Sequence, residues 1–333
     1  MLFLMTAYVV FIAVILGVII PNFSEAVLYT MLTSPWFLVF QQVMVLIFPL
    51  GLWLFLRREK LTLPNAKLGG TNIILIIFLC VFLQPLMMLL SGIMSMFFAN
   101  PVGDVVNTMM EQPMWLLILA IAVTPAICEE LVFRGYIQSA YKNRSFKKAA
   151  LINGLFFGII HMNMQQFPYA FAMGIIFAYM VHYTRSIRAG ILAHFLINAS
   201  QITLAVAVSR YVAEINNAAE VPDVLPGALD AYGLYAPAEY LTRLEQLTAL
   251  VSVGFIALMA TPFVIILFRV FISHNRQRNI KADMEQALGA ELTEPAAEEL
   301  LETNQEPQGM KFRLLKHIDP FMIAVVIVFI LLL

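Results

Sequence analysis

Charged residues are scarce in this chain of 333 residues. Asp, Glu, Lys and Arg together make up 12% of it, whereas 61% of the residues are hydrophobic. Soluble globular domains contain roughly 25% charged residues, so this composition excludes a soluble fold. The net charge of −1 argues against a nucleic-acid partner, which would need a basic face. The two cysteines, Cys80 and Cys128, lie in apolar runs, exclude a disulfide framework and are interpreted as packing residues.

Long apolar runs dominate what is present. A helix needs about 20 apolar residues to cross a bilayer. The runs that meet or approach this length are 2–20, 36–56, 73–98, 114–133, 149–163, 167–183, 189–209, 247–272 and 319–333. The sequence therefore predicts an all-α, polytopic membrane protein with about eight to nine transmembrane helices and a lipid bilayer as its surroundings.

The few basic residues alternate between connections. Lys and Arg fill the second, fourth and sixth connections and the stretch from Arg269 to Lys316, while the alternate connections contain only Arg210 and Arg243. Because basic loops remain on the cytoplasmic side, nine spans with the N-terminus inside and the C-terminus outside fit the pattern. We expect a multi-pass protein of the cell membrane, and a bacterial inner or plasma membrane suits this charge pattern.

Composition divides the chain into six parts. These are N-terminal transmembrane helices (1–113), a central core (114–209), an outer loop (210–246), a transmembrane helix (247–272), a polar cytoplasmic linker (273–318) and a C-terminal hydrophobic segment (319–333). The linker is rich in Glu and poor in aromatic residues, which is typical of a solvated segment. We expect residues 275–310 to be dispensable for any catalytic activity.

Six polar side chains lie within or at the ends of the central apolar runs. Each ionisable group at membrane depth costs about 2.5–3.5 kcal/mol, so such groups usually pair or face an aqueous cavity. They are Glu129, Glu130, Arg134, His161, His194 and Asn198. Because they come from three separate runs, convergence on one site is the economical inference.

Helical spacing assigns partners to some of these groups. Glu130 and Arg134 are four residues apart with the acid first, which is the favourable order for an ion pair. Glu129 is rotated by about 100° from Glu130 and has no partner in its own helix. His194 and Asn198 project from one face. Gly154 and Gly158 allow another helix to approach the run that ends at His161.

This combination of groups suits hydrolysis. A carboxylate can take a proton from water, imidazoles can bind a metal or stabilise an oxyanion, and Asn can donate to an oxyanion. The sequence has no G-x-S-x-G elbow, no H-E-x-x-H zinc helix and no second intramembrane Asp for an aspartic dyad. Water activated by Glu129 is the best remaining nucleophile.

Three short motifs carry a family resemblance. "EELVFRG" resembles E-E-x-x-x-R, "FGIIH" (Phe157 to His161) resembles F-x-x-x-H, and "HFLIN" resembles H-x-x-x-N. These are the motifs of the CPBP family of intramembrane proteases, which includes type II CAAX prenyl endopeptidases and the bacterial abortive-infection and bacteriocin-immunity membrane proteins. The motifs stand in family order on separate predicted spans. The resemblance covers roughly residues 114–209.

The resemblance implies a role for each motif residue. Glu129 and His161 would activate the catalytic water, His194 and Asn198 would support the oxyanion, and Glu130 with Arg134 would order the site. The substrate would be a membrane-associated protein or peptide. Members are called metalloproteases, so zinc held by His161, His194 and Glu129 is one form of the site. The same groups acting without a metal are the other.

Two other functional classes remain open at this stage. In an ion-coupled transporter or channel, Glu129 and the histidines would relay ions, and paired halves with broken helices would support that function. The sequence shows no such pairing. A non-catalytic scaffold that keeps the family fold is the third possibility, against which the intact motifs argue.

Overall fold

The fold is known from a computed structural model that describes residues 30–31, 33–56, 63–140, 145–161, 163–219 and 243–291. Every regular element in these ranges is a helix, and the only β-contact among them is an isolated bridge between Asn65 and Ser186. The prediction of an all-α membrane protein is confirmed. The runs predicted at 2–20 and 319–333 lie outside the described residues.

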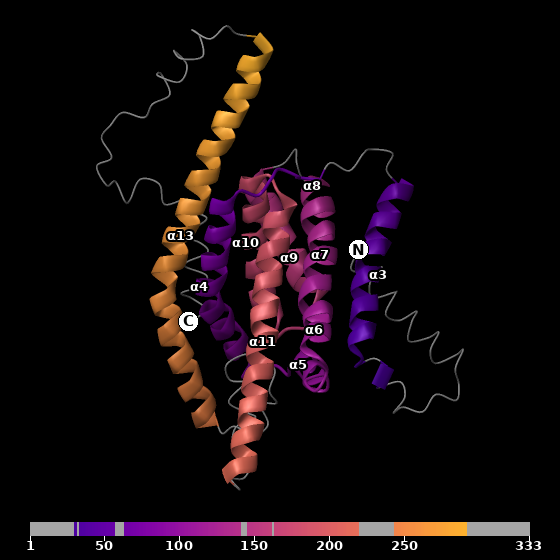
Figure 1. Ribbon diagram of the computed structural model, residues 1–333, viewed down its shortest axis with the longest axis vertical. Coiled ribbons are helices and arrows are strands. Elements are labelled where there is room, and N and C mark those ends of the chain that lie inside the picture. The colour runs from indigo at the N-terminus through magenta and orange to yellow at the C-terminus, as the bar shows by residue number, and fades with distance from the viewer. Residues whose placement is uncertain are drawn as a thin grey trace. The chain divides into compact units, whose positions relative to one another are not determined.

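The helices follow one another with short connections in the first part of the chain (Figure 1). Their bounds are α3 Pro35–Leu56, α4 Gly70–Ser95, α5 Pro101–Asn107, α6 Met114–Leu117, η1 Ile118–Val123, α7 Thr124–Glu130, η2 Leu131–Ile137, α8 Gln138–Ala140, α9 Phe146–Ile160, α10 Phe167–Thr184, α11 Ile187–Ala219 and α13 Arg243–Glu291. The chain divides into two units, residues 1–277 and 278–333, and the described residues of the second unit continue α13 as helix.

Four helical stretches are long and apolar enough to cross a membrane, judged over the described residues. They are Gly70–Ser95, Met114–Ile137, Ile187–Tyr211 and Gln246–Glu285. By contrast, α9 has only 15 residues. At 1.5 Å per residue it is about 22 Å long, shorter than a hydrocarbon core of about 30 Å. The fifth predicted span is therefore a short helix that does not reach across the core.

Large apolar side chains are exposed along α4 and α13. Val81 in α4 is 58% exposed, and Val251 and Phe255 in α13 are 72% and 65% exposed. Contiguous exposed apolar surface of this kind is unusual in soluble monomers and normal where a helix faces lipid. These faces agree with a membrane protein.

The fourth predicted span is one continuous run of helix, from α6 to α8, that contains two π-helical segments. One of them, η1, immediately precedes α7, in which Pro125 occupies the second position. Pro125 has no N–H to offer the carbonyl of Ile121, and its ring crowds that carbonyl. The π-helical segments were not predicted, because the residues of this run fit an ordinary α-helix equally well.

Glycine contacts hold α9 against α10. A Cβ atom at Gly154 would overlap the carbonyl oxygen of Phe171 at 2.7 Å, and one at Gly174 would overlap the Cα atom of Gly154 at 2.7 Å. A Cβ atom at Gly158 would lie 3.0 Å from the Phe167 ring. The predicted close approach at Gly154 and Gly158 is confirmed, and it brings the end of α9 that carries His161 close to α10.

The first residues of the predicted polar linker are helical. Residues 273–291 are helical in α13, and the side chain of Asn275 is fully buried. Asn275 and Asn72 of α4 exchange two hydrogen bonds of 2.9 and 2.8 Å between their side-chain amides. Most described side chains from 276 to 285 are exposed, so the solvated segment stays a prediction there. Its helical form follows from Ala, Glu, Gln, Met and Lys, which are good helix formers even where few aromatics occur. Residues 292–318 lie outside the described part.

Candidate active site

A cavity of about 270 Å³ lies among α3, the η1–α7 run, α9, α10 and α11. Glu129, His161, His194 and Asn198 all line it. The structure therefore brings together the four residues that the sequence placed in the chemistry. Their individual roles remain predictions.

Glu130 pairs with Arg134, as its spacing predicted. Arg134 Nη1 donates to Glu130 Oε1 at 2.8 Å, and neither side chain is exposed. The same oxygen lies 3.1 Å from Nδ1 of His194 on α11. Glu130 therefore links its own helix to the helix that carries two of the cavity residues, a contact that sequence spacing could not predict.

Aromatic rings surround the Arg134 guanidinium. Its central carbon lies 4.6 Å from the ring centroid of Phe157 and 5.2 Å from that of Phe177. Its Nη2 donates to the Gly174 carbonyl at 2.9 Å. A cation over a ring face is stabilised by the negative electrostatic potential of that face. Arg134 is thus held by a carboxylate, a carbonyl and the rings of Phe133, Phe157 and Phe177.

Gly190 of α11 makes room for this arrangement. A Cβ atom at Gly190 would overlap Oε2 of Glu130 and would lie 2.9 Å from Cγ2 of Val181. Glu130 Oε2 is buried and has no hydrogen-bond partner in the described part of the chain. Close packing of α11 against this carboxylate therefore depends on a residue without a side chain.

Glu129 has a different environment from its neighbour Glu130. It is only 7% exposed, it lines the cavity, and its Oε2 has no hydrogen-bond partner among the described residues. A buried polar atom without a partner needs a reason, and a functional role is one of them. Of the two glutamates, Glu129 is the one that lines the cavity, and its role as the base remains a prediction.

Backbone and carboxylate contacts assign the tautomers of both histidines. Nδ1 of His161 lies 2.7 Å from the Phe157 carbonyl, and Nδ1 of His194 faces Glu130. Because a carbonyl or carboxylate oxygen only accepts, each Nδ1 carries a proton, and Nε2 of each ring is the nitrogen left for another partner. Phe157 packs edge-on against both imidazoles, with ring centroids 5.3 Å from His161 and 5.6 Å from His194.

Asn198 also has a structural partner. Its Nδ2 donates to the Ile121 carbonyl at 3.0 Å, the same carbonyl that Pro125 leaves without its usual α-helical bond. This bond ties α11 to the fourth span. One N–H of the amide is used in this way, and the second is not needed for this bond.

The donor types suit zinc, but their arrangement does not form a zinc site. Imidazole nitrogens and a carboxylate are ordinary zinc ligands, and structural or catalytic sites use at least three protein ligands. Within the described ranges, no three His, Cys, Asp or Glu side chains lie close enough together to hold a metal ion. The residues as arranged do not fit the predicted set of His161, His194 and Glu129, so no step of the mechanism below passes through a metal.

Several cavity residues were not found from the sequence. Four glutamines line the cavity, Gln41 and Gln42 from α3, Gln166 at the start of α10 and Gln201 from α11. Gln201 follows Asn198 by three residues and His194 by seven, so its position on the helical face was a usable signal. There was no such signal for Gln41 and Gln42, because α3 is far from the motifs in the chain and its packing against them could not be predicted.

Comparisons with known proteins concern this same part of the chain. Residues 111–200 match the family described as type II CAAX prenyl endopeptidase Rce1-like. The resemblance to the CPBP family is thereby confirmed for this segment. A Bacillus subtilis (strain 168) protein named "Putative membrane peptidase YdiL" is 34% identical over 84 residues, which cover 25% of this chain and 34% of that protein. The matched stretch thus spans about a third of that relative's length. No solved structure matches the chain.

Proposed function

We propose that this protein is an intramembrane endopeptidase of the bacterial cell membrane that hydrolyses a peptide bond of a membrane-associated protein or peptide. One observation carries the proposal: a buried Glu129 oxygen without a partner lines a 270 Å³ cavity together with His161, His194 and Asn198. The similarity to a membrane peptidase and to the Rce1-like family supports the choice of a peptide bond.

Glu129 acts as the general base. It takes a proton from a water molecule while the water oxygen bonds to the carbonyl carbon of the substrate, and the Nε2 lone pair of His161 helps to orient that water. The C–N bond then breaks, and Glu129 delivers the same proton to the leaving amine nitrogen. Water and peptide are consumed, and a carboxylic acid and an amine are formed.

His194 and Asn198 stabilise the negative charge that develops on the carbonyl oxygen. When His194 carries both ring protons, Nδ1–H is held by Glu130 and Nε2–H is available to the oxyanion. The second N–H of Asn198 provides another donor. Glu130 and Arg134 fix the orientation of the His194 ring and are positioning residues.

Cleavage by the reconstituted full-length protein tests the proposal. A library of internally quenched, single-span peptides is placed with the protein in liposomes, and products are identified by mass spectrometry. We expect wild type and Glu111→Gln to cleave, because Glu111 is exposed and does not line the cavity. Glu129→Gln should not. Ion flux that requires Glu129, in the absence of any cleavage, would establish a transporter instead.

A further inference from the structure

Several glutamines of the described residues differ in their hydrogen bonding. Away from the 270 Å³ cavity, Gln84 donates to Ser200 and to the Ile197 carbonyl, and Gln165 donates to Ser91. These amides connect one part of the protein to another. Their presence in an apolar chain is explained by their protein partners.

The cavity glutamines lack such partners. Gln166 is only 6% exposed, yet its side chain makes no hydrogen bond within the described residues. The Oε1 atom of Gln42 is buried and unpartnered in the same ranges. Gln201 also lines the cavity without a side-chain hydrogen bond there. Unpaired amides in a membrane protein are costly unless something else binds them.

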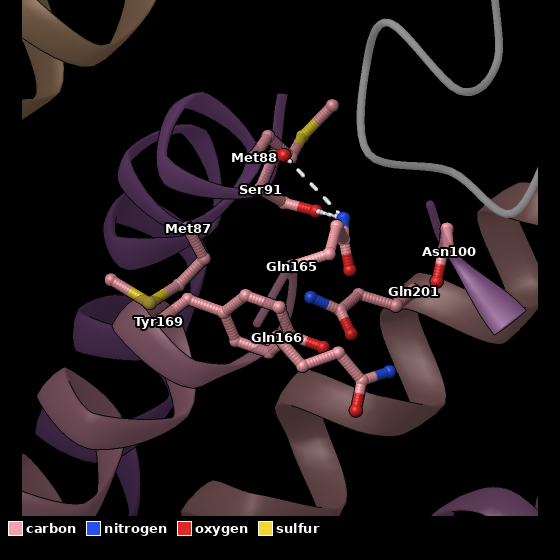
Figure 2. Close-up of a pocket in the computed structure, with 8 residues that line it drawn as sticks. All are labelled: Met87, Met88, Ser91, Asn100, Gln165, Gln166, Tyr169 and Gln201. Carbon is pink, nitrogen blue, oxygen red and sulfur yellow. Dashed lines mark hydrogen bonds between the residues drawn. The ribbon is translucent and has the colours of Figure 1, made fainter. Parts of the chain in front are cut away.

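Gln165 and Gln166 show the contrast at adjacent positions. Nε2 of Gln165 lies 2.6 Å from Oγ of Ser91, whereas no dashed line reaches Gln166 or Gln201 from any residue drawn in Figure 2. Gln166 and Gln201, together with Tyr169, line both this small pocket and the larger cavity. The two pockets therefore share an amide-bearing wall.

The position of this wall relates it to the proposed chemistry. His194, Asn198 and Gln201 lie at intervals of four and three residues on α11, so the three side chains share one face of the helix. Gln166 begins α10 just after the connection that follows His161. Gln42 approaches the same cavity from α3. The three amides thus border the acid–base residues from three helices.

An unwound substrate segment needs hydrogen-bond partners for its backbone. A peptide bond inside a helix is shielded, so an endopeptidase acts on an extended segment whose N–H and C=O groups have lost their helical partners. In an apolar environment each such group must be bound by something else. A glutamine amide offers two N–H donors and one carbonyl acceptor, which is the same chemistry as the peptide groups of the substrate.

We infer that Gln166, Gln201 and Gln42 form a subsite that binds the unwound backbone of the substrate next to the scissile bond. This inference rests on the proposed endopeptidase function and adds the conformation that the substrate takes. Because the amides bind main-chain groups, the subsite selects segments that can unwind and does not select particular side chains. These three are positioning residues, since the reacting atoms belong to the neighbouring site.

Backbone ester substitution tests the subsite directly. The library peptide that is cleaved best is remade with esters that replace, one at a time, the amides flanking the scissile bond, which removes single N–H donors. In wild type we expect at least one ester to lower kcat/KM by about fivefold, mainly through KM. For the unmodified peptide, Gln166→Met or Gln201→Met should lower kcat/KM by a similar factor. In these variants, the same ester should lower kcat/KM no further.

Gln165→Met is the matched control. It removes an amide that is bonded to Ser91, so it should lower the melting temperature and leave the ester effect unchanged. Gln166→Met should leave the melting temperature unchanged or raise it, because it removes an unpaired amide. An ester effect of the same size in wild type and in both cavity variants would overturn the inference. If no peptide is cleaved, the proposed function fails. If Gln165→Met and Gln166→Met lower the melting temperature equally, the subsite is overturned while the proposed function stands.

Discussion

Glu130 Oε1 lies 3.1 Å from Nδ1 of His194, although 64 residues separate them in the chain. The same oxygen also accepts a hydrogen bond from Arg134, whereas Oε2 of Glu130 has no hydrogen-bond partner in the described part of the chain. The adjacent Glu129 has a buried oxygen without a partner in the described part of the chain. Each of the two neighbouring glutamates thus has one buried oxygen without a partner among the described residues, and Glu129 is the one of the two that lines the cavity.

Arg134→Ala should reduce stability as well as activity. It leaves Glu130 as a buried charge without its main partner, and breaking a buried pair costs roughly 3–5 kcal/mol. It also removes the cation from the rings of Phe157 and Phe177. We expect a melting temperature in detergent that is lower by several degrees. An inactive variant with the melting temperature of wild type would place Arg134 in the chemistry.

Gly190→Ala should be destabilising although alanine favours helices. The added methyl group would overlap Glu130 Oε2 and push α11 away from the fourth span. Gly254→Ala on α13 is the matched control, because a Cβ atom there meets only Leu89 at an ordinary 3.8 Å. Alanine should raise helix stability at Gly254 by up to about 1 kcal/mol. Equal melting temperatures for the two variants would refute this account of Gly190.

The pair Asn72 and Asn275 should behave as a unit. Leucine at either position alone leaves one buried amide without its partner, at a cost of roughly 1–3 kcal/mol. Leucine at both positions removes both amides and should recover most of the loss. Thermal unfolding of the two single variants and the double variant measures the coupling. Strictly additive losses would show that the reciprocal hydrogen bonds contribute little.

Metal dependence can be decided on purified protein. Because the described side chains form no three-ligand group, we expect cleavage to survive chelation and an active sample to hold far less than one zinc per chain. His161→Ala should then lose activity with no change in metal content. Zinc at about one per chain, lost together with activity in His161→Ala, would reinstate the zinc site.

Local sequence patterns were sufficient for the helical class, for the Glu130–Arg134 pair and for the glycine contacts of α9. Each of these depends on spacing within a single helix or on residue size. The contact between Glu130 and His194 depends on how two distant helices pack, so it could not be read from spacing. The Asn72–Asn275 pair was missed for the same reason. Asn275 lies near the start of a stretch whose polar composition had indicated a solvated linker.

Asn198 shows how a motif residue can have a second role. The H-x-x-x-N pattern indicated an oxyanion donor, and the structure adds a hydrogen bond to the Ile121 carbonyl that Pro125 leaves free. The sequence contains both Pro125 and Asn198, but only the packing of α11 against the fourth span brings them into one arrangement. If Asn198→Ala loses activity, its melting temperature must therefore be measured too, because the substitution also removes a structural hydrogen bond.

The single-turnover cleavage rate of Glu129→Gln tests the central claim most directly. The measurement uses the library peptide cleaved best by wild type, with protein in excess, in liposomes, and with melting temperatures measured in parallel. We predict a melting temperature equal to that of wild type or higher and a cleavage rate lower by about 10²–10⁴-fold, which is the usual contribution of general-base catalysis. Among the described residues, Glu129 is the only carboxylate that lines the cavity. A rate within about tenfold of wild type in a folded Glu129→Gln protein would contradict the assignment of Glu129 as the base.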